Sequence, residues 1–202
     1  MTNTQTPAFQ LALGQDWAKL HPAVKKHYDL SPGQSLKLSG TMDTVHHSPL
    51  VKPLIWIGRI FGALVPYTGK DIPVEVQNSC TPNANHLRFQ RVFHFPGQTP
   101  YCFNSRMEYW DGNTIVEFVR FGLGIRMDLS VEGNVLHYQT RGYIWRMGKF
   151  HISLPDNLFF GKGDITEHGV DNDTIDTNFT MTHPLYGRTF RYGGRFTICA
   201  SR

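Results

Sequence analysis

The sequence predicts a mainly β protein with minor α content. The expected fold is a curved antiparallel β-sheet or barrel of about 9–10 strands, wrapped over an apolar helix and preceded by an N-terminal helix. Apolar and polar residues alternate with a period of two through most of residues 72–199. Short turns rich in Gly, Asn and Asp separate these runs, which is typical of an antiparallel meander. So many strands in one sheet must curl or close, and a two-sheet sandwich is the alternative.

The first third of the chain carries the helical signals. Residues 9–30 place apolar side chains at spacings of three and four, which indicates an amphipathic helix. Pro22 interrupts this pattern, so we expect a break there and a short second turn. Residues 35–46 then alternate strictly and predict the first strand.

Residues 49–65 predict a helix that is apolar on nearly every side. Ser48 is a good N-cap residue, and the proline after it suits the first helical position. A helix with this composition must be covered by protein, by a partner or by lipid. We expect the stripe of Leu54, Ile57 and Phe61 to lie buried beneath the curved sheet.

The antiparallel meander is expected over residues 72–199. Residues 123–131 give the clearest alternation, and Asp111-Gly112-Asn113 predicts a tight hairpin turn. Further strands are expected near residues 149–153, 164–168, 174–182 and 188–199. No break in composition divides the chain, so residues 1–202 are expected to form a single domain.

Composition and charge exclude several classes of protein. The net charge is +4 with no basic cluster, which argues against nucleic-acid binding and leaves a weak contact with an anionic membrane surface open. No apolar run reaches the length that would span a bilayer, and we expect no secretory leader. The three widely spaced cysteines are typical of reduced thiols, so a cytoplasmic location is expected.

Motifs of catalysis are absent from the sequence. No dinucleotide fingerprint, phosphate-binding loop or nucleophile elbow occurs. The ten histidines are scattered rather than spaced as metal ligands. We therefore expect no catalytic residue, no metal and no cofactor, and the chain is more simply explained as a non-enzyme.

Arg91 is the sharpest anomaly in the predicted strands. It shares its strand phase with Phe89 and Phe93, so the guanidinium is expected to point inward. A buried Arg needs a carboxylate, and Glu117 lies on the apolar phase of another strand. The pair has two readings: a structural ion pair that fixes strand register, or a charged anchor for a carboxylate or phosphate in an apolar cavity.

Aromatic side chains on the same strand phases raise a similar question. They either fill a core or line a pocket, and strand number alone does not decide between the two. The candidates are Phe89, Phe93, Tyr101, Phe103 and Tyr109.

Four short motifs carry a family resemblance: Phe89-Gln-Arg-Val-Phe, Ile115-Val-Glu-Phe, His183-Pro-Leu-Tyr-Gly and Tyr192-Gly-Gly-Arg-Phe. In this order they resemble the bacterial family catalogued as domain of unknown function 4166, over about residues 17–196. The resemblance implies that His183 and Tyr192, like the Arg and Glu above, fall in characteristic motifs, so both join the candidate ligand-binding residues. Members of that family occur alone or fused to an NAD(P)-binding reductase-like domain, and the family has no established activity.

Three functions are compatible with the sequence. The first is a non-catalytic binding domain for an apolar or acyl-type small molecule. The second is an enzyme, or an accessory domain of an NAD(P)-dependent reductase system. The third is a protein- or membrane-docking module that uses the helix at 49–65. An interior cavity of several hundred Å³ favours the first two, whereas a filled barrel with an exposed apolar helix favours the third.

Overall fold

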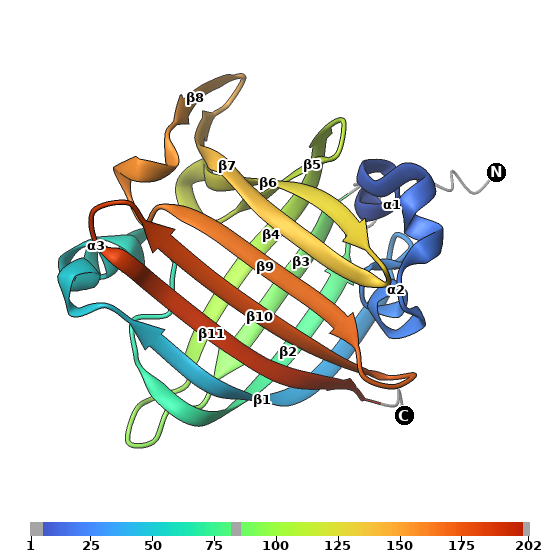
Figure 1. Cartoon of the computed structure of the whole chain (residues 1–202), viewed down its shortest axis with the longest axis horizontal. Helices are drawn as coiled ribbons and strands as arrows, with labels where there is room; N and C mark the ends of the chain where they lie inside the picture. Colours follow the sequence, from blue (N-terminus) through green and yellow to red (C-terminus); the bar gives the residue numbers. More distant parts are fainter. Residues whose placement is uncertain (1–5, 82–85, 200–202) are drawn as a thin grey trace.

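The computed structural model describes residues 6–81 and 86–199. Within them, antiparallel strands wind into a closed barrel that carries short helices at both ends (Figure 1). The helices and 3-10 turns are α1 (Ala8–Leu13), η1 (Gly14–Lys19), α2 (Pro22–Tyr28), η2 (Pro49–Val51), α3 (Lys52–Phe61), η3 (Arg120–Gly122) and η4 (Asp156–Leu158). The strands are β1 (Ser35–His47), β2 (Gly69–Cys80), β3 (His86–Phe93), β4 (Tyr101–Asp111), β5 (Thr114–Phe118), β6 (Leu123–Glu132), β7 (Val135–Met147), β8 (Phe150–Leu154), β9 (Lys162–Gly169), β10 (Thr174–His183) and β11 (Gly187–Ile198).

Pairing between β6 and β7 closes the barrel. The strand order β6-β5-β4-β3-β2-β1-β11-β10-β9-β7 forms one continuous sheet, and β6 also pairs with β7. Ten strands therefore form the wall, while β8 pairs with the last residues of β7 in a hairpin outside the wall. The predicted barrel is confirmed and the sandwich alternative is wrong, because a closed sheet leaves no open edge on the wall.

The N-terminal helices close one end of the barrel. The break expected at Pro22 is confirmed, because α2 begins there, where a proline at the first turn loses no helical hydrogen bond. Phe9 and Tyr28 are buried, and their rings stack with centroids 3.8 Å apart. The main core runs from these rings into the inner face of the barrel.

The position expected for the apolar helix is wrong. α3 lies at the opposite end of the barrel from α1 and α2, not beneath the sheet (Figure 1). Ile57 is 56% exposed, Leu54 and Phe61 are only half-buried, and Ile55 is the large side chain of α3 that is fully buried. The interior of this barrel is instead occupied by the inward side chains of its own strands and by residues of α1 and α2. None of the helices in the described part of the chain is long and apolar enough to cross a membrane.

Candidate functional site

Arg91 and Glu117 meet inside the barrel, as their strand phases predicted. Arg91 Nη1 donates to Glu117 Oε1 at 3.1 Å and to Ser105 Oγ at 3.0 Å. The Ser105 hydroxyl in turn donates to Glu117 Oε1 at 2.5 Å. The two charged side chains are 15% and 14% exposed, so the salt bridge is largely withdrawn from solvent. β3, β4 and β5 each contribute one member of this cluster because they are consecutive neighbours in the sheet.

Aromatic rings hold the guanidinium of Arg91 in place. Its Cζ lies 4.9 Å from the ring centroid of Phe89 and 5.1 Å from that of Phe103. Contacts of this kind favour a desolvated cation through the negative face of the ring. The interior therefore stabilises the charge of Arg91 both by an ion pair and by ring faces.

A second polar cluster surrounds Glu167 on β9. Tyr28 donates a hydrogen bond to Glu167 Oε2 at 2.6 Å, and Tyr138 reaches the same oxygen at 3.0 Å. The two tyrosine hydroxyls are also 2.6 Å apart. Among the described residues, the other carboxyl oxygen has a single, long contact of 3.5 Å with the Thr177 hydroxyl, which donates to it. All four side chains are buried, so one oxygen of Glu167 keeps spare hydrogen-bonding capacity inside the barrel.

Burial controls protonation in this cluster. It raises the pKa of Glu167, although the two tyrosine hydroxyls and the charge of Arg91 act in the opposite direction. It also raises the pKa of Tyr28 and Tyr138 well above the usual tyrosine value, and the adjacent carboxyl group adds to this shift. Both hydroxyls therefore keep their protons and act as donors.

His27 is one of several buried polar side chains without a hydrogen-bond partner among the described residues, a group that also includes Asn78. His27 is buried, and within the described residues neither of its ring nitrogens has a hydrogen-bond partner. Its ring stacks on Tyr28 with centroids 4.5 Å apart. Burial, together with the charge of Arg91, lowers the pKa of His27 to about 3, so the imidazole is neutral and offers one donor and one acceptor.

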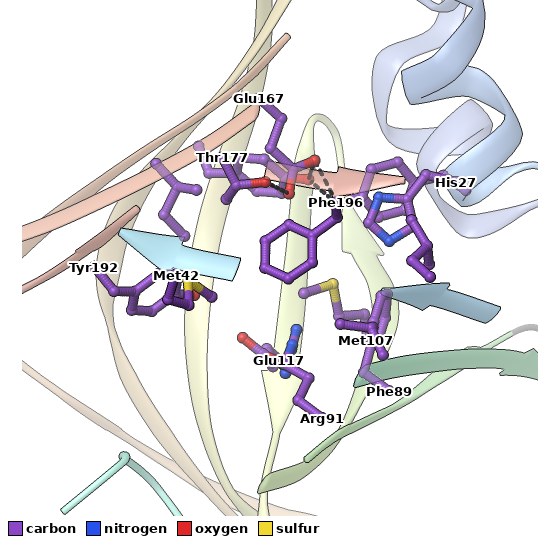
Figure 2. A pocket seen from close by; sticks show the side chains of 15 residues that line it. His27, Met42, Phe89, Arg91, Met107, Glu117, Glu167, Thr177, Tyr192 and Phe196 are labelled. Carbon is purple, nitrogen blue, oxygen red and sulfur yellow. Dashed lines mark hydrogen bonds and ion pairs between the residues drawn. The ribbon is translucent and has the colours of Figure 1, made fainter. Parts of the chain in front are cut away.

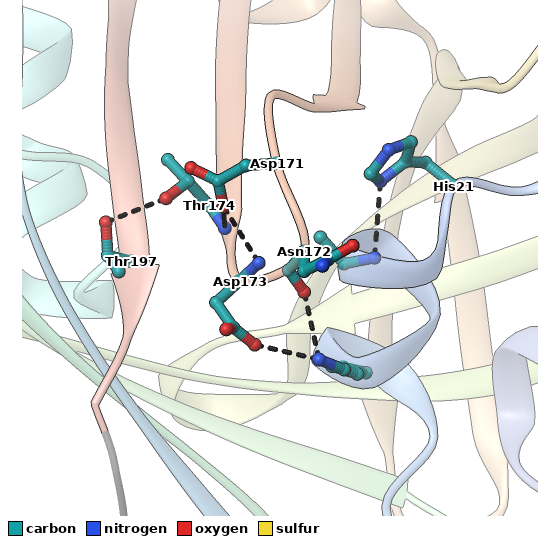
Figure 3. Close-up of polar contacts among 8 residues, drawn as sticks. His21, Asp171, Asn172, Asp173, Thr174 and Thr197 are labelled. Atoms are coloured by element: carbon teal, nitrogen blue, oxygen red, sulfur yellow. Dashed lines mark hydrogen bonds and ion pairs between the residues drawn. The ribbon is translucent and has the colours of Figure 1, made fainter.

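Polar contacts outside the barrel hold α2 in the position that brings His27 and Tyr28 inside. Lys26 donates to the Asn172 carbonyl at 3.0 Å and to Asp173 at 2.8 Å in the β9–β10 turn (Figure 3). Asp171 keeps this turn compact by accepting from two backbone amides, those of residues 173 and 174, at 2.9 and 2.8 Å. The residues that follow Lys26 thus face the barrel interior, whereas Lys26 itself stays on the surface.

Three small cavities run through the barrel and share lining residues. The first, of about 60 Å³, lies between His27, Glu167 and Arg91 (Figure 2). The second, of about 50 Å³, shares Arg91, Glu117 and Tyr192 with the first. The third, of about 70 Å³, shares Glu117 with the second and continues along more apolar side chains. Because the three cavities share lining residues, we describe them together as one channel, which side chains interrupt. The Arg91–Glu117 ion pair lies at its centre.

The structure brings most of the candidate residues to this channel. Those that line it are Phe89, Arg91, Phe93, Phe103, Glu117 and Tyr192. Tyr101 lies beside the channel rather than in it and donates a hydrogen bond to the Leu64 carbonyl at 3.0 Å.

Two candidates lie elsewhere. Tyr109 is at the end of β4 near α1 and is 36% exposed, because the inner phase of that strand runs out of the barrel there. His183 is buried, but it stabilises the β10–β11 turn instead. Its Nε2 contacts the Asn157 carbonyl at 2.9 Å, and its Nδ1 accepts from the Leu185 amide at 3.1 Å. Neither side chain lines the channel.

Sequence reasoning missed the cluster around Glu167. Tyr28 comes from α2 and Tyr138 from β7, which are 110 residues apart in the chain. The alternating phase of β7 was a usable signal for Tyr138, since Leu136 and Thr140 on its phase are also buried. No local pattern could show that a tyrosine at a helix end would reach the same carboxyl group.

Comparisons with known proteins agree with the motifs. The sequence profile of the family described as Domain of unknown function (DUF4166) matches residues 20–196. The chain is 33% identical over 191 residues to the uncharacterized protein YndH of Bacillus subtilis (strain 168), and the match covers 88% of this chain and 90% of that protein. The chain therefore belongs to the family described as Domain of unknown function (DUF4166).

Proposed function

We propose that the barrel is a non-catalytic binding domain for a slender apolar molecule that lies along the interior channel. The observation that carries the proposal is the series of three cavities with common walls, which contact α2 at one extreme and residues just after α3 at the other. A row of narrow cavities suits a flexible chain, such as an acyl or isoprenoid chain, better than a bulky ring system.

The cavities are smaller than the several hundred Å³ of an average ligand site, so the ligand must displace side chains. Methionines provide this adaptability. Met42 and Met107 line the first cavity, Met127 the second and Met181 the third. Methionine is unbranched and has three rotatable bonds, so it can repack around a ligand at low cost.

The polar groups of the channel favour an uncharged polar end on that molecule. Glu117 already neutralises Arg91 at 3.1 Å, so the interior holds no unmatched cation for a carboxylate or phosphate. Glu167 lies on the same cavity and repels an anion whenever it is ionised. Neutral His27 instead offers one donor and one acceptor, which a hydroxyl or carbonyl group can satisfy. We therefore place the polar end of the ligand next to α2.

The first test is native mass spectrometry of the purified protein, with extraction of any molecule it carries. The second is displacement of a fluorescent acyl probe by three unlabelled chains of equal length, an alcohol, a carboxylate and an amine. We expect the alcohol to compete best. Preference for the carboxylate would contradict the uncharged polar end but keep the binding function, whereas no saturable binding of any chain would refute both.

A channel-blocking variant sharpens this test. Ile125 lines both the second and the third cavity, so Ile125→Phe should weaken probe binding at least tenfold. Gln77→Phe adds the same ring on an exposed position of β2 and should leave binding unchanged. Equal affinities in the two variants, both with native-like circular dichroism, would place the probe outside the channel.

A further inference from the structure

Exposed apolar side chains gather at the α3 end of the barrel. On α3, Trp56 is 60% exposed and Ile60 is 63% exposed. Phe121 in η3 is 67% exposed, and Phe150 at the start of β8 is 80% exposed. Monomeric proteins rarely leave aromatic and branched side chains grouped in this way without a binding role.

These residues form one surface, because side chains from three segments meet there. The ring of Phe61 lies 6.0 Å from Phe121 and 6.5 Å from Trp145, measured between centroids. The Trp145 indole donates to the Phe121 carbonyl at 2.9 Å. Phe150 pairs with Met147 on the neighbouring strand, two residues beyond Trp145, and so continues the same face. We call this surface, formed by Trp56, Ile57, Ile60, Phe121, Trp145 and Phe150, the apolar end.

The opposite end and the wall of the barrel differ from it. At the α2 end, Leu11 on α1, Tyr109 at the end of β4 and Val170 after β9 are exposed. Leu185 and Tyr186 in the β10–β11 turn are exposed as well. Exposed hydrophobic residues in such small numbers are ordinary for a protein surface. The grouping at the apolar end is therefore not a general property of this chain.

The backbone at Phe121 is strained in a way that keeps its ring exposed. Phe121 has a φ of 59°, a left-handed conformation that is unfavourable for a bulky residue. Such strain is typical of functional sites, where the surrounding structure holds it in place. Because the Phe121 ring stays in solvent, its burial does not offset the backbone strain in the free protein. The position of the ring therefore points to a binding partner that covers it.

Three segments of the apolar end carry basic side chains and no acidic ones. Segments 50–66, 119–126 and 141–154 contain no Asp or Glu. Lys52, Arg59, Arg120 and Lys149 lie in these segments, and no carboxylate in the described part of the chain forms an ion pair with them. The Arg59 guanidinium stacks 4.5 Å above the Trp56 ring, so a cation and an indole are presented together.

We propose that the apolar end docks on the surface of an anionic lipid bilayer. Aromatic and branched side chains enter the boundary between head groups and acyl chains, while the surrounding cations contact lipid phosphates. Trp side chains favour this boundary because their rings are apolar and their N–H is polar. The basic side chains of these three segments match an anionic membrane. This proposal stands independently of the interior channel.

Such docking also explains where a ligand would come from. The third cavity is lined by Leu64, which follows α3, and by Leu123, which follows η3. Both are half-buried residues directly beside the apolar end. An apolar molecule could thus pass between bilayer and barrel without crossing water.

The test is co-sedimentation of the full chain with vesicles. Phosphatidylcholine vesicles are compared with vesicles that also contain phosphatidylglycerol, and binding is expected to be much stronger to the second kind. Trp56→Ser with Ile60→Ser should reduce the partition coefficient at least tenfold. Leu11→Ser with Val170→Ser at the other end is the matched control and should change it little. Lys149→Glu should reduce it at least fivefold, and Lys37→Glu on the distant part of β1 should not.

Equal binding to both vesicle types, or no binding, would overturn the proposal. Equal losses in the test and control variants would also overturn it, because binding would then depend on net charge or folding alone. If light scattering shows a dimer that Trp56→Ser with Ile60→Ser converts to a monomer, and vesicles do not bind, a second copy of the chain covers this surface. Quenching of tryptophan emission by brominated acyl chains would support insertion of the apolar end.

Discussion

Removal of Arg91 and removal of Glu117 should lower the free energy of unfolding by different amounts. Arg91→Met leaves Glu117 bonded to the Ser105 hydroxyl at 2.5 Å. Glu117→Leu leaves the guanidinium with the neutral Ser105 oxygen at 3.0 Å and the rings of Phe89 and Phe103. A carboxyl group can take up a proton and become neutral, whereas a guanidinium keeps its charge at any pH the fold survives. Glu117→Leu, which leaves Arg91 without a carboxylate partner, should therefore be less stable than Arg91→Met.

The magnitude follows from the burial of the pair. Its side chains are only 15% and 14% exposed, and removal of one partner from such a pair costs about 3–5 kcal/mol. We expect Arg91→Met to lose about 3 kcal/mol. Glu117→Leu should lose about 4–5 kcal/mol. The double variant should recover most of the loss, so the coupling energy is at least about 3 kcal/mol.

Urea unfolding followed by tryptophan fluorescence and circular dichroism measures all four proteins of this cycle. The exposed pair of Lys19 and Asp16, 2.6 Å apart with side chains 61% and 46% exposed, is the control. Its coupling energy should stay below about 1 kcal/mol. Equal losses for the two interior single variants, with no coupling, would refute the reasoning, because the pair would then behave as a solvated one. A double variant that folds and still binds an acyl probe would show that the pair is structural.

Two further predictions concern single side chains. His27 has a pKa near 3 in the folded protein and near 6.5 when unfolded, so the unfolded chain takes up a proton first and stability falls as pH drops through this range. Glu167, with its raised pKa, acts in the opposite direction, but His27→Phe should still remove about 2 kcal/mol of the loss between pH 6.5 and 4.5, whereas the exposed His46→Phe should not. In urea unfolding, Ile55→Ala should cost about 2–5 kcal/mol and Trp56→Ala less than about 0.5 kcal/mol. The reason is that Ile55 is buried whereas Trp56 is exposed. Equal losses would contradict the position of α3.

Strand phase explains why part of the interior could be predicted. A period of two decides which side chains share a face, and in a closed barrel one face is the interior. That rule placed Arg91 and Glu117 inside from local sequence alone, and the need to pair a buried charge joined them. The strands that follow the first helical third were predicted for the same reason, since their turns carry their own residue signals.

The same reasoning fails where cover comes from distant elements. The apolar content of residues 49–65 shows that this segment must be covered, but it does not show which part of the protein or which partner covers it. In the structure, α3 lies exposed at one end of the barrel instead of beneath the sheet. The Glu167 cluster depends on α2 crossing one end of the barrel, which Lys26 and Asp173 help to fix across 147 residues. Local periodicity carries no information about such contacts, because they follow from closure of the whole barrel.

Together, the polar cluster and the apolar end give the barrel a direction. His27 and Glu167 lie where α2 closes the channel. The lining becomes more apolar toward the third cavity, where Phe160 and Met181 contribute to it. A chain-like ligand with one uncharged polar end can satisfy both regions in only one orientation, with that end at α2 and its tail toward α3. The reverse orientation would leave the imidazole nitrogens unpartnered, which costs about 1–3 kcal/mol for each nitrogen. Insertion from a bilayer at α3 would therefore have to lead with the polar end, and the adaptable methionines along the channel are placed to let it pass.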